Sequence, residues 1–153
     1  MLLTQICQAT SVRVPLQSRD KLSAIGELID LLDANRLVED KEAVSHAVFT
    51  RESTRSTGIG SGIAIPHGKC KSIKELVMAI GITHDPIDFE SIDNQPVSIV
   101  ILLVSPTDQT GPHVQALAKI SRIMLDETFK QAFSQAATAE EAYRLLQDKE
   151  NEQ

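Results

Sequence analysis

The stretch Val97-Ser98-Ile99-Val100-Ile101-Leu102-Leu103-Val104 is the longest apolar run in this chain of 153 residues, and Ser98 is its one polar residue. Such a run is typical of a strand that other elements cover on both faces. It is far shorter than the ~20 apolar residues that a membrane-spanning helix requires. We therefore expect a central strand at this position, with packed layers on both sides, and no membrane insertion.

The middle of the chain predicts further strands around this one. Apolar residues form a short segment from Ile63 to Ile65 and a longer one from Leu76 to Thr83, and an edge strand from Ile87 to Phe89 is expected after the turn-forming residues His84-Asp85-Pro86. Near the N-terminus, apolar and polar residues alternate from Val12 to Leu16, which favours a short, half-buried strand. One sheet built from these strands is therefore expected.

Helical spacing of apolar residues precedes and follows the strands in the sequence. We expect a helix from the N-cap Ser18 to Asn35, and a second one from the cap Asp40 to about Arg51. The last third predicts three more helices, which contain Val114 to Leu125, Phe129 to Phe133, and the residues after the cap Thr138. This order of elements predicts an α/β fold, a three-layer α/β/α domain with a central mixed β-sheet.

Length and composition bound the organisation of the chain. No repeat, low-complexity tract or linker divides it, and its length suffices to bury a core without a metal or a disulfide. We therefore expect a single domain over residues 1–153, with its core at about 3–148. Cys7 and Cys70 are expected to be free, buried thiols. The first residues lack the basic and apolar regions of a secretion signal, which favours the cytoplasm.

The charge of the chain excludes one large class of partner. Fifteen Lys and Arg against 21 Asp and Glu give a net charge of −6. Binding to a nucleic acid requires a cluster of basic residues that neutralises its phosphates, and the sequence contains no such cluster. A nucleic-acid partner is therefore not expected.

The segment Ser56 to Lys69 is unusually rich in glycine, but it matches neither of the common nucleotide-binding motifs. A dinucleotide fingerprint requires a third glycine where Ile63 stands. A P-loop requires four residues between its first glycine and Gly-Lys, whereas five separate Gly62 from Gly68. What remains is glycine at every second position, 58, 60 and 62, which lets the backbone approach a ligand and turn its N–H groups toward an anion. These glycines have no evident packing role in the sequence, so we predict a phosphate-binding loop.

His67 is the first candidate for a catalytic residue. It follows Pro66, which fixes the backbone, at the end of a short apolar strand, where side chains of layered α/β domains usually meet their ligands. A neutral imidazole has a free ring nitrogen that can attack phosphorus. We therefore interpret His67 as a nucleophile for a phosphoryl group.

Two further side chains are candidates for holding that group. His113 follows Gly111-Pro112 at the start of a predicted helix, where unpaired N–H groups and the helix dipole favour an anion. Arg51, near the end of the second helix, can bind phosphate oxygens through its planar guanidinium. We interpret Arg55, His46 and His84 as structural or solvent-facing residues.

At these residues the sequence resembles the enzyme IIA domain of the bacterial phosphoenolpyruvate-dependent phosphotransferase system, in its mannitol/fructose class. The resemblance rests on the segments Arg51-Glu52, 56–60 and 62–68, and on spacings of 16 residues from Arg51 to His67 and 46 from His67 to His113. It extends from the first strand to the last helix. One departure is Ser61, where the family commonly has Asn.

The resemblance implies a phosphotransferase that works through a covalent phosphohistidine and needs no cofactor. His67 would accept the phosphoryl group from a phosphohistidine of HPr or a similar carrier, while His113 and Arg51 position and stabilise it. Thr57 and the glycines Gly58, Gly60 and Gly62 would contribute to phosphate binding. Phosphoryl transfer of this kind is catalysed mainly by positioning and charge stabilisation.

The family that the sequence resembles has two branches. A regulatory, nitrogen-related protein would signal through its phosphorylation state to a regulated target protein. A fructose/mannitol-type component would instead pass the phosphoryl group to a IIB partner for sugar uptake. The segment Ser56-Thr57-Gly58-Ile59-Gly60 and a chain without room for IIB or IIC domains favour the regulatory branch.

Two functions of other classes remain open at the level of sequence. His67, Cys70 and His113 supply the ligand types of a His2Cys zinc site, although no carboxylate base is evident nearby. A binding module whose histidines are never phosphorylated is the other alternative. The intact motif around His67 favours the phosphotransferase over both.

Overall fold

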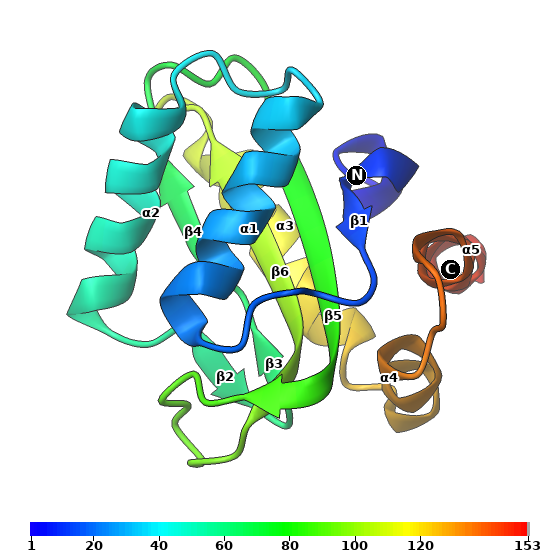
Figure 1. Cartoon of the computed structure of the whole chain (residues 1–153). Helices are drawn as coiled ribbons and strands as arrows, with labels where there is room; N and C mark the ends of the chain where they lie inside the picture. Colours follow the sequence, from blue (N-terminus) through cyan, green and yellow to red (C-terminus); the bar gives the residue numbers. More distant parts are fainter. Residues whose placement is uncertain (153) are drawn as a thin grey trace.

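The computed structural model describes residues 1–152, and in it the apolar run forms the central strand β6, Val97–Ser105 (Figure 1). β5 (Val77–Ile87) is antiparallel to β6, and β1 (Val12–Arg13) runs parallel to β5 at the far edge. On its other side, β6 pairs with two short parallel strands, first β3 (Ile63–Ala64) and then β4 (His67–Lys69). β2 (Gly58–Gly60) is antiparallel to β3 and completes a six-stranded mixed sheet.

The helices begin at side chains that accept a hydrogen bond from the first turn. Asp20 caps α1 (Lys21–Ala34), Asp40 caps α2 (Lys41–Thr54), and Asp126 caps α4 (Glu127–Ser134). Thr138 caps α5 (Ala139–Asn151), whereas α3 (Thr110–Ile123) has no side-chain cap at Gln109. Two 3₁₀ turns, η1 (Leu3–Gln5) and η2 (Ala9–Ser11), precede β1. None of the helices within residues 1–152 has both the length and the apolar character needed to cross a membrane.

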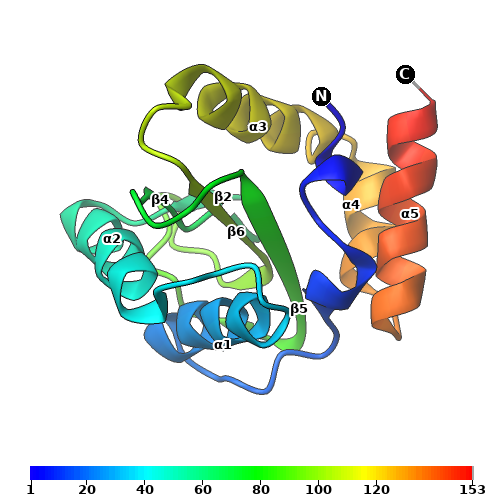
Figure 2. The same ribbon diagram turned by 90° about the horizontal axis from the view of Figure 1, so that it is seen from above.

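The sheet separates two apolar cores, and helices lie on both sides of it (Figure 2). α1 and α2 cover one face, where side chains such as Leu28 and Val48 share a core with Val100 and Leu102. α3, α4 and α5 lie on the other side, where Ile120 and Phe133 share a core with Ile101 and Leu103 of β6. The expected three-layer α/β/α fold with a mixed sheet is therefore confirmed, and β6 contributes to both cores.

Two boundary predictions are wrong. Ser18 does not cap α1, because its amide and hydroxyl both donate to Glu27, and Asp20 takes the capping position. The residues from His84 to Pro86 do not form a turn before a separate edge strand. β5 continues through them to Ile87, with an irregular register against β6 after Ile82.

The glycine-rich segment is a β-hairpin, which sequence reasoning missed. β2 and β3 pair through a turn in which Gly60, Ser61 and Gly62 have φ angles of 96°, 58° and 83°. A two-residue hairpin turn with positive φ at both central residues matches the right-handed twist of the strands, and glycine adopts this conformation without strain. Ser61 and Gly62 therefore form the turn, and the spacing of the glycines reflects the backbone conformation of the hairpin.

Two other glycines of the segment are packing positions. A side chain at Gly58 would overlap Ser91, and a Cβ at Gly68 would lie 3.1 Å from backbone atoms of Ala47 and Val48 in α2. α2 thus lies against β4 because Gly68 has no side chain. The absence of a packing role for these glycines, expected from the sequence, is wrong.

We predict that Gly68→Ala destabilises the protein by about 1–3 kcal/mol, because the new methyl group pushes α2 away from β4. The matched control is Gly26→Ala within α1, where an added Cβ meets no atom within 4 Å. That control should stabilise the protein by about 0.5–1 kcal/mol through helix propensity. Denaturant unfolding measures both, and equal effects of the two variants would contradict the packing of α2 on Gly68.

Candidate active site

The fold brings His67 and His113 together although 46 residues separate them. His67 opens β4, and its neighbour across the sheet is Leu103 of β6. β6 ends at Ser105, and a short loop leads into α3, whose first turn carries His113. The centroids of the two imidazole rings lie 5.5 Å apart in an edge-to-face arrangement. The sheet and the loop after β6 therefore create the pair that the sequence predicted.

The ring of His67 is held in one protonation state by the backbone. Its Nδ1 lies 2.7 Å from the carbonyl oxygen of Ile65, which can only accept a hydrogen bond, so Nδ1 carries the proton and Nε2 keeps its lone pair. Burial lowers the pKa of His67, the bond to Ile65 opposes this effect, and the positive charge of Arg51 adds to it. His67 is therefore a neutral imidazole near pH 7 with Nε2 as its nucleophilic atom.

His113 is buried, with 5% of its surface exposed. Its Nδ1 lies 2.7 Å from Oγ of Ser105. Burial, together with the neighbouring His67 and Lys69, lowers the pKa of His113 to about 4. His113 is therefore neutral at physiological pH and offers hydrogen bonding rather than charge.

A hollow of about 290 Å³ lies in front of His67. Arg51 and Arg55 line it and give it positive charge, while Thr57 lines it from the start of β2. Ile59 and Ile92, 45% and 66% exposed, are apolar side chains of its rim. Arg55, interpreted from the sequence as a solvated charge, thus belongs to the lining of the hollow.

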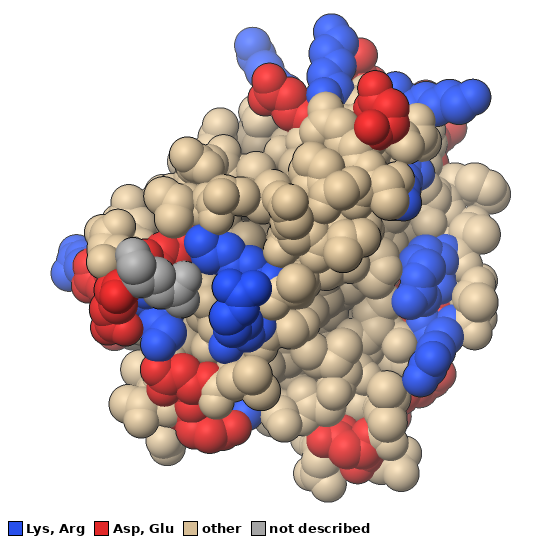
Figure 3. All heavy atoms as spheres, turned by 180° about the vertical axis from the view of Figure 1, so that it is seen from behind, with Lys and Arg blue, Asp and Glu red and all other residues tan. Residues whose placement is uncertain are grey.

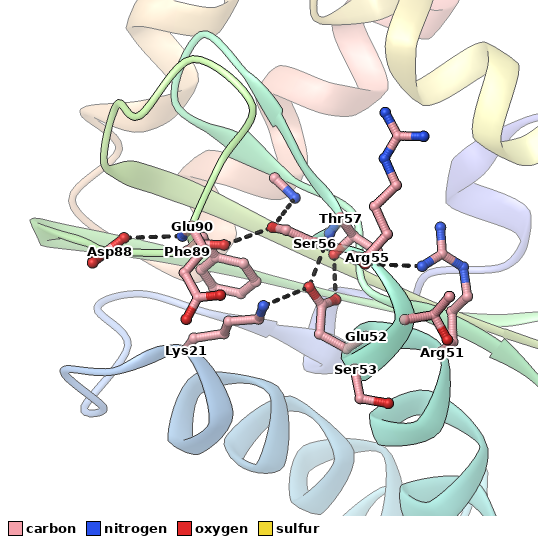
Figure 4. A network of polar contacts seen from close by, with 12 residues as sticks. Lys21, Arg51, Glu52, Ser53, Arg55, Ser56, Thr57, Asp88, Phe89 and Glu90 are labelled. Atoms are coloured by element: carbon pink, nitrogen blue, oxygen red, sulfur yellow. Dashed lines mark hydrogen bonds and ion pairs between the residues drawn. The ribbon is translucent and has the colours of Figure 1, made fainter.

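The last turn of α2 holds the wall of this hollow through a polar network (Figure 4). Arg51 donates from Nη1 to the carbonyl oxygen of Arg55 at 3.0 Å. Glu52, which is 4% exposed, accepts from the amide of Thr57 at 2.9 Å and from its hydroxyl at 2.5 Å. Lys21 of α1 lies 3.0 Å from the same carboxylate. Two consecutive residues of α2 therefore fix the segment 55–57.

Glu52 supports the candidate site, and its role in holding Thr57 was not predicted from the sequence. A signal was present in the sequence. A carboxylate near the C-terminus of a helix is unfavourable against the helix dipole, and such a residue needs a compensating partner. The partners, Lys21 and Thr57, come from other elements and become visible only in the folded chain.

The predicted phosphate-binding residues have partners within the protein. The amide and the hydroxyl of Thr57 both donate to Glu52, and the amide of Gly58 donates to Oγ of Ser56. Gly60 precedes the turn of the hairpin, and Gly62 is the second residue of that turn. Of these four residues, Thr57 lines the hollow, and phosphate binding by the group stays a prediction.

The alternative of a zinc site formed by His67, Cys70 and His113 is wrong. Within residues 1–152, no three His, Cys, Asp or Glu side chains lie close enough to hold a metal ion together. Sγ of Cys70 instead lies 3.0 Å from Oγ of Ser72, so Cys70 does not join His67 and His113 in a ligand set. His46 and His84 are exposed, in agreement with their interpretation as solvent-facing residues.

The face that carries α3 has most of its charged side chains at the margins, around a largely uncharged middle (Figure 3). A broad basic patch does not cover this face. The net charge of the chain is −6, so the protein as a whole does not attract a partner through positive charge.

The model of the family described as "Phosphoenolpyruvate-dependent sugar phosphotransferase system, EIIA 2" matches residues 5–149. The chain belongs to this family. The family membership predicted from residues 51–68 and His113 is thereby confirmed. This IIA domain has relatives among both nitrogen regulatory proteins and fructose-specific components.

Three relatives illustrate the similarity. The nitrogen regulatory protein of Escherichia coli (strain K12) is 37% identical over 146 residues, which cover 94% of this chain and 86% of that protein. The fructose-specific EIIABC component of Bacillus subtilis (strain 168) is 32% identical over 136 residues, and the match covers 89% of this chain but only 21% of that protein. The crystal structure of nitrogen regulatory protein IIA-Ntr from Neisseria meningitidis has a TM-score of 0.87 and 27% identity, and the match covers 94% of this chain and 98% of that one.

We predict that Glu52→Ala costs about 3–5 kcal/mol of unfolding free energy, because it leaves the ammonium of Lys21, whose side chain is 14% exposed, and two donors of Thr57 without a partner. The control is Glu39→Ala, which removes a carboxylate from an ion pair with Lys74 whose side chains are 66% and 81% exposed. We expect that control to change stability by less than about 1 kcal/mol. A cost for Glu52→Ala as small as that of the control, measured by urea unfolding, would show that the network does not hold the wall of the hollow.

Proposed function

We propose that this IIA domain accepts a phosphoryl group on Nε2 of His67 from the phosphohistidine of an HPr-like carrier protein and passes it to a second protein. The observation that carries the proposal is the hydrogen bond from Nδ1 of His67 to the carbonyl oxygen of Ile65. It leaves Nε2 as the unprotonated nitrogen of a neutral ring beside a hollow lined by Arg51 and Arg55.

The proposed transfer exchanges one phosphorus–nitrogen bond for another. The bond between phosphorus and the carrier's histidine breaks, and its electron pair returns to the carrier's ring. Nε2 of His67 supplies the pair for the new bond, so the ring of His67 gains positive charge. The Ile65 carbonyl, 2.7 Å from Nδ1, stabilises that charge through the proton that Nδ1 keeps.

Groups beside His67 that can bind the phosphoryl oxygens support the proposal. Arg51 lines the hollow, and its guanidinium is fixed by the carbonyl of Arg55. His113 lies beside His67 in the first turn of α3, the end of the helix where the dipole favours an anion. Preorganised groups of this kind supply most of the catalysis of phosphoryl transfer.

The regulatory, nitrogen-related branch is the function we favour for this protein. Its support is 37% identity to the nitrogen regulatory protein of Escherichia coli (strain K12) over 86% of that protein's length. In this function the phosphorylation state of His67 is read by a regulated target protein. The second candidate is transfer to a IIB partner in sugar uptake, and 32% identity to part of the fructose-specific EIIABC component of Bacillus subtilis favours it.

We predict that incubation with phosphoenolpyruvate, enzyme I and HPr adds one phosphoryl group that is labile in acid and stable in base. His67→Ala should abolish the mass increase, because it removes the nucleophile. His113→Gln is the comparison variant, and we expect it to fold and to be labelled about 100-fold more slowly through loss of one preorganised group. Mass spectrometry measures both, and full labelling of His67→Ala would refute the proposed acceptor.

We expect the phosphorylated protein to keep its phosphoryl group when mixed with a fructose- or mannitol-specific IIB domain, as a regulatory protein would. The measurement is the lifetime of the phosphohistidine with IIB alone and with IIB, IIC and sugar. The His67→Ala variant, incubated in the same way, gives the background. Rapid, sugar-dependent loss of the group would assign the protein to the transport branch instead.

A further inference from the structure

Ser105 lies beside the histidine pair but takes no direct part in the proposed transfer to His67. It is the last residue of β6, it is fully buried, and it faces Lys69 of β4 in the register of the sheet. Its hydroxyl oxygen lies 2.7 Å from Nδ1 of His113. The end of the central strand therefore contacts the second histidine directly.

The direction of this hydrogen bond follows from the burial of both groups. Across residues 1–152, the contact with His113 is the one hydrogen bond that the Ser105 hydroxyl makes. If the hydroxyl accepted from Nδ1, its own proton would be buried without an acceptor, which is costly. If it donates to Nδ1, both groups are satisfied. Ser105 therefore donates, and the proton of the neutral His113 ring resides on Nε2.

His67 has the opposite arrangement. Its Nδ1 faces the carbonyl of Ile65, a group that only accepts, whereas Nδ1 of His113 faces a hydroxyl that donates. The two neutral rings, 5.5 Å apart between centroids, therefore hold complementary tautomers. Nε2 of His67 has a free lone pair, and Nε2 of His113 has a proton.

We propose that Ser105 is a positioning residue that holds His113 in its Nε2–H tautomer, so that this ring donates a hydrogen bond to the phosphoryl group on His67. The inference rests on the proposed function of His67 and deepens it. It gives the end of β6 a role, because Ser105 determines which nitrogen of His113 donates a hydrogen bond. Residues that fix a histidine tautomer in this way act through the ring and do not touch the reacting atoms.

A neutral hydrogen-bond donor at His113 suits a phosphoryl group that His67 must pass on to a second protein. Burial of His113 keeps the ring uncharged at physiological pH. The phosphoryl oxygens thus gain a directed hydrogen bond without a full ion pair to a buried imidazolium. Because the donor is held before the phosphoryl group arrives, no reorganisation of the ring accompanies the transfer.

The first test reads the tautomers without any phosphoryl donor. In the unphosphorylated, 15N-labelled protein at pH 7.5, NMR distinguishes protonated from unprotonated ring nitrogens, and His67→Ala and His113→Gln assign the signals. We expect His67 to be protonated on Nδ1 and His113 on Nε2. Protonation of His113 on Nδ1 would overturn the proposal. This readout is independent of the proposed function, which fails separately if HPr does not label His67.

The second test compares Ser105→Ala with Ser105→Thr, which keeps the hydroxyl. We expect Ser105→Ala to populate the Nδ1–H form of His113 and to slow phosphoryl transfer about tenfold, less than the 10²–10³ cost of removing one preorganised donor. The final extent of labelling on His67 should not change, and Ser105→Thr should restore both the rate and the tautomer.

Ser11→Ala is the matched control, because Ser11 is an equally buried serine whose hydroxyl contacts Asn35 in another part of the fold. We expect it to leave the transfer rate within about twofold of the unaltered protein. Slower transfer in Ser105→Ala with an unchanged His113 tautomer would overturn the proposal, because the serine would then act through packing alone. If Ser105→Ala does not fold, the tautomer of His113 in the unaltered protein decides the question.

Discussion

Both edges of β6 are hydrogen-bonded, and this double pairing determines where the candidate site forms. On one edge β5 runs antiparallel along most of the strand, and on the other β3 and β4 pair with it in succession. His67 lies opposite Leu103, and the strand ends two residues later at Ser105, next to the loop that leads to His113. A central strand buried on both faces is thus also the element from which the histidine pair is positioned.

The other side of the site depends on α2. Its last turn supplies Arg51 to the hollow and Glu52 to the interior, and these neighbours bind the backbone of Arg55 and Thr57. α2 reaches this position because Gly68 allows its backbone to approach β4 closely. The charge in the hollow and the packing of the helix are therefore linked, and neither histidine contributes charge of its own near neutral pH.

Much of this arrangement could be predicted from the sequence because it is local or repeats a strong pattern. The apolar run of β6, the caps Asp40 and Thr138, and the candidate histidines follow from residue types and spacing. The hairpin at Ser61 was missed because glycines give the same sequence pattern in a ligand-binding loop and in a turn with positive φ. Glu52 and Ser105 were missed because their partners lie on other elements. Contacts between elements distant in sequence carry no periodicity, so they appear only when the topology is known.

Under the proposed function, the neutrality of the two rings bears on how a partner would distinguish the phosphorylated from the unphosphorylated protein. In the unphosphorylated protein, the uncharged imidazole of His67 lines the hollow beside Arg51, and the exposed apolar side chains of Ile59 and Ile92 lie on its rim. In the proposed function, a phosphoryl group on His67 would add negative charge at one point inside that rim. The hairpin beside it is tied down, since Asp93 accepts from the amide of Ser61 and Lys130 donates to its carbonyl. In the proposed function, a protein that packs against this rim would therefore distinguish the phosphorylated from the unphosphorylated form by the charge at His67.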